Sequence, residues 1–390
     1  MIRVLHVVTI MNRNGLENRI MDIYRNIDRS QIQFDFLTHR KEKGQFDEEI
    51  KKLGGHIYRM SPLTPKNFIK YMKNLHKFFC EHREYKIVHS HINTFSTWVL
   101  FVAKTAGIPV RIAHSRTWGM EKSWKSIFKW VSKIFINIPT THKFACSKQA
   151  GIWLFGRKGI ERPNFFHVIP NSIIIEKFQY SKEKREIIRN QLGLKENQYA
   201  FVNVGRLTPQ KNHKFLLEVF KEILKTNPSS KLYLIGEGDL KHKIDQQIEK
   251  YNMKDAVIYI GNISNVGDYL NAMDGFIFPS IFEGFGTVTI EAQCSGLPIV
   301  ASDSIPKETK ITNLQEFISL KESPTIWAQK ITEKIKGNRR MDFSNEVKKA
   351  GYDIKDTYKY LQEFYLNVSK NNTMKKHEIK MKGNKNENKI

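Results

Sequence analysis

Two cations and two carboxylates stand at spacings that suit a charged, hydroxylated ligand. Arg206 and Lys211 lie in a loop between a β-rich run and a helical pattern. An arginine fork and a lysine point charge together suit a diphosphate. Glu283 and Glu291 bracket a turn further along the chain. Because a carboxylate repels phosphate, we expect these two side chains to bind hydroxyl groups; each residue taken alone is typical of a solvated surface.

The turn after the apolar run at 275–279 has the features of an anion site. Gly284 and Gly286 allow backbone N–H groups to approach a ligand closely, and Phe285 lies between them. Thr287 then begins a predicted helix, whose N-terminus presents the positive end of its dipole. The sequence therefore predicts that the backbone amides of this turn cradle a phosphate.

Alternating short apolar runs and amphipathic helical patterns must position these residues. In the first half of the chain the runs predict strands at residues 3–9, 31–37, 57–60, 87–92, 110–114, 143–147 and 166–169. In the second half they predict strands at 200–204, 231–235, 257–260, 275–279 and 298–301, with helices at 213–225, 240–252 and 287–295. Such alternation indicates parallel sheets, with ligands expected where loops leave the carboxyl ends of strands.

The chain is therefore predicted to be an α/β protein with two Rossmann-like, doubly wound domains. We expect an N-terminal domain over 1–175 and a C-terminal domain over 176–353. A C-terminal helix over 354–369 is expected to cross back to the first domain. The remaining segment, 370–390, is rich in Lys and Asn and is expected to be a disordered basic tail.

Composition excludes several classes of protein. The 390 residues are 40% hydrophobic, which is enough for a packed core. The most apolar stretch, 97–113, is interrupted by Lys104 and Arg111, so no membrane-spanning helix is predicted. The first ten residues read as a strand rather than a signal peptide. The three cysteines are far apart and fit a reducing cytosol without a disulfide framework or zinc site.

The charge excess is concentrated in the first half. Residues 1–179 carry 30 Lys and Arg against 13 Asp and Glu, whereas residues 180–369 carry 27 against 24. A basic half usually faces nucleic acid or an anionic membrane surface. General lysine richness is the alternative explanation, and charge alone does not decide between them.

The motifs as a set resemble glycosyltransferase family 4, whose members are retaining, nucleotide-sugar-dependent enzymes of the GT-B fold. The resemblance is carried by Gly-Arg-Leu-x-Pro-x-Lys-Asn at 205–212, by Glu-Gly-Phe-Gly at 283–286, and by Glu291. Segments 168–171, 235–240 and 295–302 reinforce it, and it extends to about residue 368.

The resemblance implies roles for the residues of the second half. Arg206 and Lys211 would hold the donor pyrophosphate, and Glu291 would bind the nucleotide ribose. Glu283 would contact sugar hydroxyls or the leaving phosphate as a catalytic residue. The amides of residues 284–287 would complete the phosphate site.

In the first half the resemblance implies two further residues. Gly15 matches the glycine loop that approaches the donor phosphates, although Asn14 stands where the family usually has a second glycine. His114 matches the catalytic histidine beside the anomeric carbon of the sugar. Residues 304–308 replace the usual glycine pair after 301–303, a variant similar to enzymes of capsule and exopolysaccharide assembly, and they leave the donor sugar open.

The expected activity is transfer of a hexosyl or N-acetylhexosaminyl group to a lipid-linked glycan in cell-surface polysaccharide assembly. The chain has no Asp-x-Asp triplet, which removes the usual carboxylate pair for a Mg²⁺-bound diphosphate. We therefore expect no metal and no cofactor. Two alternatives stay open: a GT-B nucleotide-sugar epimerase and a non-enzymatic nucleic-acid-binding protein.

A basic, aromatic helix is predicted over 121–138. Its apolar residues fall on one helical face, and lysines follow another. This pattern is typical of a helix lying on an anionic membrane, but a helix packed on its own domain fits about equally well. The candidate membrane or acceptor surface consists of Trp124, Lys125, Lys129, Trp130 and Lys133. We accordingly expect a cytoplasmic protein, peripheral on the inner face of the cytoplasmic membrane.

Overall fold

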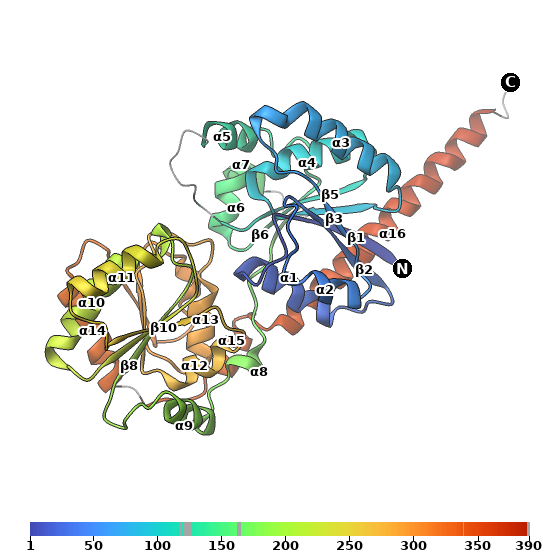
Figure 1. The fold of residues 1–390 in the computed structure, drawn as a ribbon. Coiled ribbons are helices and arrows are strands. Elements are labelled where there is room, and N and C mark those ends of the chain that lie inside the picture. Colours follow the sequence, from blue (N-terminus) through green and yellow to red (C-terminus); the bar gives the residue numbers. More distant parts are fainter. Residues whose placement is uncertain (118, 120–125, 162–164, 338, 388–390) are drawn as a thin grey trace. The chain divides into compact units, whose positions relative to one another are not determined.

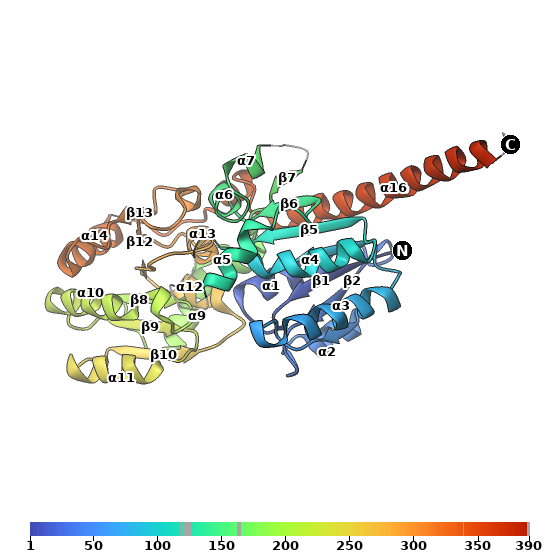
Figure 2. The same cartoon turned by 90° about the horizontal axis from the view of Figure 1, so that it is seen from above.

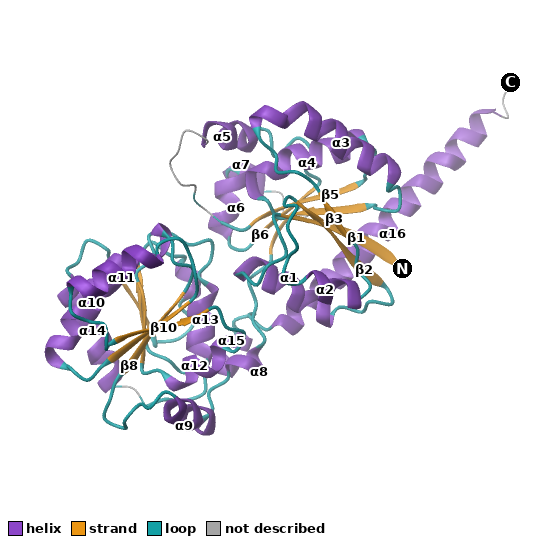
Figure 3. Cartoon of the chain, in the orientation of Figure 1, coloured by secondary structure: helices purple, strands orange, loops and turns teal. Residues whose placement is uncertain are grey.

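The computed structural model describes residues 1–117, 119, 126–161, 165–337 and 339–387. The chain forms two compact units: Met1–Pro170 with Ile354–Ile390, and Asn171–Asp353. Each unit is a parallel β-sheet with helices on both faces (Figure 1, Figure 3). The predicted fold class, two doubly wound α/β domains, is confirmed.

The sheet of the first unit has seven strands in the order β3-β2-β1-β4-β5-β6-β7. All its strand pairs are parallel, and the sequence order reverses direction between β1 and β4. The strands are β1 (Ile2–Val8), β2 (Ile32–Thr38), β3 (Ile57–Arg59), β4 (Ile87–Ser90), β5 (Val110–Ser115), β6 (His142–Ala145) and β7 (Phe166–Val168). The seven strands predicted from the sequence are all present, with ends shifted by no more than two residues.

Helices connect these strands and cover both faces of the sheet. They are α1 (Gly15–Asn26), α2 (Asp47–Lys52), α3 (Phe68–Glu81), α4 (Ser96–Thr105), α5 (Ser126–Ile134), α6 (Lys148–Phe155) and α7 (Arg157–Ile160), with 3-10 turns at Pro65–Asn67 and Asn93–Phe95. Leu5 and Val7 of β1 share a buried cluster with side chains of α3 and α4. The two helices are labelled beside the strands of this unit in Figure 2. In the part of the chain that the structure describes, no helix is both long and apolar enough to cross a bilayer.

The sheet of the second unit has six parallel strands in the order β10-β9-β8-β11-β12-β13. They are β8 (Ala200–Val204), β9 (Lys231–Ile235), β10 (Val257–Gly261), β11 (Gly275–Phe278), β12 (Ile299–Ser302) and β13 (Gln315–Ile318). The first five were predicted. The sixth was missed, because Gln315 and Glu316 break the apolar run of an edge strand that pairs only with β12.

The helices of the second unit also lie on both faces of its sheet. They are α8 (Ile175–Phe178), α9 (Lys182–Gln191), α10 (His213–Thr226), α11 (Lys241–Lys250), α12 (Val266–Ala272), α13 (Thr287–Cys294), α14 (Pro324–Lys336) and α15 (Ser344–Lys349), with 3-10 turns at Pro209–Lys211 and Lys307–Thr309. On one face, α10, α11 and α14 share a buried core with the central strands, including Phe220, Ile248 and Trp327.

The last helix, α16 (Ile354–Glu387), belongs to the first unit. The carboxamide of Gln362 accepts a hydrogen bond from the Asp28 amide at 3.0 Å, which ties the helix to the end of α1. The helix continues past residue 370, where the sequence predicted disorder to begin. Lysine, a good helix former, is the commonest residue in that stretch, and it contains no proline.

Candidate active site

The loop after β8 and the loop after β11 are joined by hydrogen bonds at the carboxyl ends of adjacent strands. The Ile281 amide donates to the Gln210 carbonyl at 2.8 Å, and the Gln210 carboxamide donates to the Phe282 carbonyl at 2.8 Å. The structure therefore brings the two motifs of the second unit together. This edge of a parallel sheet is where ligands bind in doubly wound folds.

Lys211 and Glu283 form an ion pair within this loop pair. The Lys211 Nζ lies 2.6 Å from the Glu283 Oε1, and their side chains are 14% and 10% exposed. The ammonium also lies 4.7 Å from the centre of the Phe278 ring. Lys211 is thus held in place before any ligand arrives, and its charge is balanced by the carboxylate that the sequence assigned to hydroxyl binding.

Arg206 differs from Lys211 in its surroundings. Its side chain is exposed and makes no hydrogen bond or ion pair with any described residue. Gly205, immediately before it, leaves room for the Lys211 side chain, since a Cβ there would lie 2.7 Å from the Lys211 Cε. One cation is therefore buried and paired, and the other is available to an incoming anion.

The turn before α13 contains a glycine in the left-handed conformation. Gly286 adopts a φ of 83° as the N-cap, a left-handed conformation that favours glycine. The side chain of Glu283 packs over it, with its Cγ 3.9 Å from the place a Gly286 Cβ would take. Phe285 is buried against Tyr352, with ring centres 5.6 Å apart. Thr287 begins the helix. The Thr289 amide donates to the Gly286 carbonyl at 2.9 Å, so the amides before it, those of Thr287 and Val288, are the ones that can bind an anion.

Glu291 lies one turn into α13 and is 7% exposed. Glu283, before the helix, is 8% exposed. Both predicted carboxylates are therefore withdrawn from bulk water at the same end of the sheet. Their roles as ribose and sugar ligands stay predictions.

A second segment with two glycines, Gly236 and Gly238, packs against the Arg206 loop. A Cβ on Gly236 would lie 2.2 Å from the Gly205 carbonyl oxygen, and one on Gly238 would lie 2.5 Å from the Leu207 carbonyl oxygen. The Leu207 amide donates to the Glu237 carbonyl at 2.9 Å. These glycines are needed for close backbone packing between the two loops.

Gly15, the predicted phosphate-loop residue of the first unit, is the first residue of α1. It is exposed, and a Cβ there would meet nothing within 4 Å. Asn14, immediately before it, is extended, with a φ of −106°. The loop is instead held to the Gln45 side chain, which accepts from the Arg13 amide at 2.9 Å.

His114 lies near the carboxyl end of β5 and is 1% exposed. Its Nδ1 lies 3.0 Å from the Nε2 of His89, and its own Nε2 has no hydrogen-bond partner among the described residues. Burial, followed by the charge of Arg116, lowers the pKa of His114 well below its usual 6.5. The imidazole is therefore neutral at physiological pH.

His114 belongs to a buried network that the sequence did not predict. His6 on β1 and His89 on β4 are register partners, and His91 follows two residues later on the same side. The network also contains Arg116 and, from α16, Tyr365. The available signal was the placement of three histidines in otherwise apolar strands, with an i, i+2 pair at His89 and His91.

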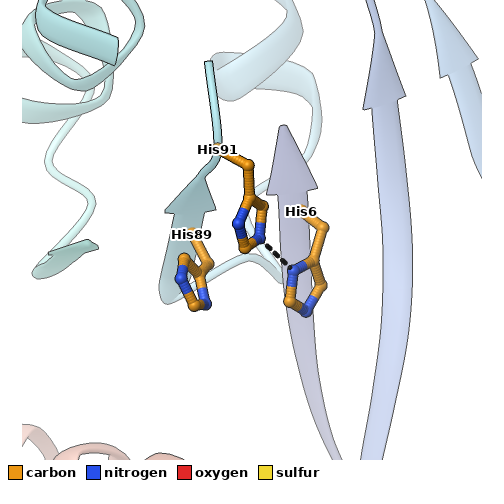
Figure 4. A group of neighbouring side chains, drawn as sticks. All are labelled: His6, His89 and His91. Atoms are coloured by element: carbon orange, nitrogen blue, oxygen red, sulfur yellow. Dashed lines mark hydrogen bonds between the residues drawn. The ribbon is translucent and has the colours of Figure 1, made fainter. Parts of the chain in front are cut away.

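His6, His89 and His91 offer nitrogens that all lie within 4.8 Å of one another, which is close enough for a shared metal ion (Figure 4). However, the His6 Nδ1 and the His91 Nε2 are hydrogen-bonded to each other at 3.0 Å. The Arg116 guanidinium donates to the other nitrogen of His91, at 3.2–3.3 Å. Metal-bound histidines usually face a carboxylate or carbonyl on that side, so the arrangement favours a hydrogen-bonded network over a metal centre.

The predicted surface helix is partly described. Trp124 and Lys125 lie outside the described residues. In α5, Ile127, Trp130 and Ile134 are 71%, 58% and 52% exposed. The apolar residues of this helix therefore do not share one buried face. Phe128 packs against Trp98, whereas Ile127, Trp130 and Ile134 are exposed.

The predicted lysine face of α5 is also incomplete. Lys129 is half-buried, and the Lys133 ammonium lies 5.0 Å from the centre of the Trp153 ring. Burial lowers the pKa of Lys133. The described part of the helix thus presents mainly apolar side chains to its surroundings.

Comparison with a solved structure identifies the fold class. The crystal structure of HepE from Anabaena in complex with UDP superimposes with a TM-score of 0.76 at 17% identity, covering 94% of this chain and 100% of that one. The two doubly wound units define the GT-B class of glycosyltransferases, as expected from the sequence.

Sequence relatives identify the family. The family model for glycosyl transferases group 1 matches residues 184–352. The putative glycosyltransferase EpsF of Bacillus subtilis is 31% identical over 377 residues, covering 94% of this chain and 97% of the relative. The chain therefore belongs to the group 1 glycosyltransferases, which confirms the resemblance carried by the motifs.

Two further relatives act in polysaccharide synthesis or on a lipid-linked sugar. The capsular polysaccharide biosynthesis glycosyltransferase CapH of Staphylococcus aureus is 27% identical over 382 residues, covering 94% of this chain and 99% of CapH. The UDP-Gal:alpha-D-GlcNAc-diphosphoundecaprenol alpha-1,3-galactosyltransferase of Escherichia coli is 27% identical over 311 residues, covering 77% of this chain and 79% of the relative.

Proposed function

We propose that the chain transfers a hexosyl or N-acetylhexosaminyl group from a nucleoside-diphosphate sugar to a lipid-linked glycan during cell-surface polysaccharide assembly. The observation that carries the donor class is the buried Lys211–Glu283 pair before α13, in a loop pair that also carries the exposed Arg206 guanidinium. The acceptor class is supported by the relatives that act in capsule synthesis and on a diphosphoundecaprenol-linked sugar.

The anionic diphosphate would be bound by positive charge of three kinds. Arg206 would approach from the exposed loop, Lys211 would contribute its ammonium, and the first amides of α13 would donate to phosphate oxygens. Charge accumulates on the diphosphate as the sugar leaves, so these groups stabilise the transition state more than the bound substrate. None of them requires a metal ion.

We propose that transfer retains the anomeric configuration. The bond from the anomeric carbon to the diphosphate oxygen breaks, and the acceptor hydroxyl oxygen forms its bond on the same face. The departing diphosphate oxygen takes the hydroxyl proton. Glu283 would orient sugar hydroxyls, because its carboxylate is fixed by Lys211 and packs over Gly286.

We further propose that α5 lies against an anionic membrane that carries the acceptor. Ile127, Trp130 and Ile134 are exposed on this helix. Lys66, Lys70 and Lys73 surround Ile69, which is 71% exposed, at the start of α3. The two helices are neighbours there, since the Phe68 and Phe128 rings lie 6.1 Å apart. Apolar side chains flanked by lysines suit anionic lipid headgroups.

The decisive experiment is a binding panel of UDP-, GDP- and CDP-sugars with the full chain, followed by hydrolysis of the best ligand. We expect one nucleotide series to bind, and hydrolysis to persist in excess EDTA. Lys241→Ala is the matched control for Lys211→Ala, because Lys241 is an exposed lysine of the same unit that pairs with Asp245 at 2.9 Å. Only Lys211→Ala should abolish binding.

Three results would contradict the proposal. Absence of binding to every nucleotide-sugar would remove the donor class. Conversion of the sugar to its epimer without an acceptor would identify an epimerase. Loss of activity in EDTA that Mg²⁺ restores would contradict metal-independent transfer.

A further inference from the structure

A chain of hydrogen bonds connects α16 to His114. The Tyr365 Oη lies 2.7 Å from the Nδ1 of His89, and the Nε2 of His89 lies 3.0 Å from the Nδ1 of His114. All three side chains are at most 1% exposed. The two imidazole rings are nearly parallel, with centres 5.2 Å apart and planes at 9°.

Proton counting fixes the direction of this chain. A neutral imidazole has one N–H donor and one acceptor nitrogen, so each bond determines the next. His89 is the sole hydrogen-bond partner of the Tyr365 hydroxyl among the described residues. If Tyr365 did not donate to His89, its buried proton would be unsatisfied, at a cost of about 1–3 kcal/mol.

Tyr365 therefore donates to the His89 Nδ1, which leaves the His89 proton on Nε2. That proton is donated to the His114 Nδ1, so the His114 proton is on Nε2. The Nε2 of His114 is the nitrogen without a partner in the described chain. The network thus ends in an N–H group that is ready to donate to a ligand.

A second chain of hydrogen bonds runs from Arg116 through His91 to His6, and its direction of donation is also fixed. Arg116 has no acceptor atom, so it must donate to the His91 Nδ1, and His91 then donates to the His6 Nδ1 at 3.0 Å. That chain ends on β1 beside Phe34, with ring centres 4.2 Å apart. His114 instead lies at the carboxyl end of β5, where ligands of doubly wound folds bind.

Burial keeps the histidines of this network neutral. Burial is the main cause that lowers the pKa of His89, His91 and His114 well below 6.5, and the Arg116 charge adds to it. Neutral rings are required for a single direction of donation, because a protonated ring would donate from both nitrogens.

We propose that Tyr365 is a positioning residue that sets the tautomer of His114 through His89, so that the His114 Nε2–H donates to a substrate oxygen at the carboxyl end of β5. The second half of this statement rests on the proposed function; the first half does not. His114 is then a neutral hydrogen-bond donor and cannot accept the proton of the acceptor hydroxyl. The C-terminal helix thereby contributes to a site built on β5.

The tautomers can be tested without any substrate. Long-range ¹H–¹⁵N spectra of the full chain, labelled on histidine, distinguish Nδ1–H from Nε2–H imidazoles, and His114→Gln assigns the signal. We expect His89 and His114 to be Nε2–H in the wild type, and Tyr365→Phe to give a mixture of both tautomers at each.

Tyr360→Phe is the matched control, because Tyr360 lies on the same helix and its hydroxyl lies 2.6 Å from the Nδ1 of His167, outside this chain. It should leave the His114 tautomer unchanged. An Nδ1–H form of His114 in the wild type would overturn the proposal. So would a Tyr365→Phe spectrum in which His114 is still entirely Nε2–H, with thermal unfolding showing that the variant is folded.

The role in catalysis is tested by two substitutions that differ in one atom. In His89→Gln the amide oxygen can accept from Tyr365 while the NH₂ group donates to the His114 Nδ1, which preserves the tautomer. In His89→Glu the carboxylate accepts from both neighbours, which forces the His114 proton onto Nδ1.

We expect kcat of His89→Glu to be at least tenfold below that of His89→Gln at pH 9, where His114 stays neutral, with the donor KM within about threefold. Equal kcat values in two folded variants would overturn the catalytic half. If the wild type binds no nucleotide-sugar, the proposed function fails, and the substrate-free spectra still decide whether Tyr365 sets the tautomer.

Discussion

The ion pair between Lys211 and Glu283 has two effects that substitution can separate. The side chains are 14% and 10% exposed, so removal of one partner leaves a largely buried charge. Breaking such a pair typically costs about 3–5 kcal/mol, whereas neutralising both partners costs less. The pair is therefore a stability element as well as a candidate donor-binding element.

We predict that Lys211→Met lowers the free energy of unfolding by about 3 kcal/mol, and that Lys211→Met/Glu283→Gln recovers part of this loss. Both variants should lose nucleotide-sugar binding, because neither supplies the ammonium. Urea unfolding measures the first effect, and calorimetric titration the second. A double variant that regains both stability and binding would show that Lys211 has only a structural role.

At the scale of an element, the Arg206 loop depends on glycines in the neighbouring loop. Gly236 has a φ of 134°, and a Cβ there would lie 2.2 Å from the Gly205 carbonyl oxygen. Backbone cannot move aside as a flexible side chain can. The position of Arg206 should therefore be sensitive to substitution of Gly236, which is distant in the sequence but packs against Gly205.

We predict that Gly236→Ala destabilises the protein by more than about 3 kcal/mol and weakens donor binding at least tenfold in the folded fraction. Gly193→Ala is the matched control: Gly193 also has a positive φ, 64°, but a Cβ there meets nothing within 4 Å. It should cost only about 1–2 kcal/mol and leave binding unchanged. Equal effects in the two variants would contradict the packing argument.

The exposed face of α5 gives a second prediction at this scale. Trp130→Asp/Ile134→Asp should reduce sedimentation with anionic vesicles at least fivefold. The reason is that two exposed apolar side chains that would enter the lipid become negatively charged and are repelled by it. Ile187→Asp, at a side chain of α9 that is 48% exposed, is the control and should bind as the wild type does. If none of the proteins sediments with vesicles at low salt, lysine richness alone explains the basic half.

At the scale of the whole molecule, the buried histidines make stability depend on pH. Burial lowers the pKa of His6 to about 3 and those of His142 and His213 to about 4, and it lowers those of His89, His91 and His114 well below 6.5. An unfolded histidine titrates near 6.5. Between these values the unfolded chain binds more protons than the folded one, so stability falls as pH falls.

We predict that the free energy of unfolding decreases from pH 7 to pH 5, with a limiting slope of about 1.4 kcal/mol per pH unit for each such histidine. Urea unfolding at several pH values measures it. His91→Gln should reduce the slope by the contribution of one group. A stability that is constant between pH 7 and pH 5 would show that the network is not neutral and buried.

The fold was largely predictable from the sequence, because its signals are local. The apolar runs predicted twelve strands within two residues of their observed ends, and the strand β13 was missed because Gln315 and Glu316 are polar. The motif around Gly286 likewise predicted its own turn, since a left-handed conformation before a helix favours glycine.

The site was predictable only in part. Residue types and spacing placed Lys211 and Glu283 in one site, but not in direct contact. Gly15 was expected at the donor phosphates only from the resemblance, and its role stays a prediction. Exposure of α5 depends on which of its faces meets Phe95 and Trp98, which periodicity alone does not specify.

The sequence by itself determined two doubly wound units, a family, and the loops that carry the charged residues. Only the tertiary structure decided which buried side chains form hydrogen bonds with one another, and therefore which nitrogen of each histidine carries the proton. Tyr365 lies 276 residues from His89, and no local pattern connects them. Their hydrogen bond exists because α16 packs on the first sheet, and a buried hydroxyl must find an acceptor there.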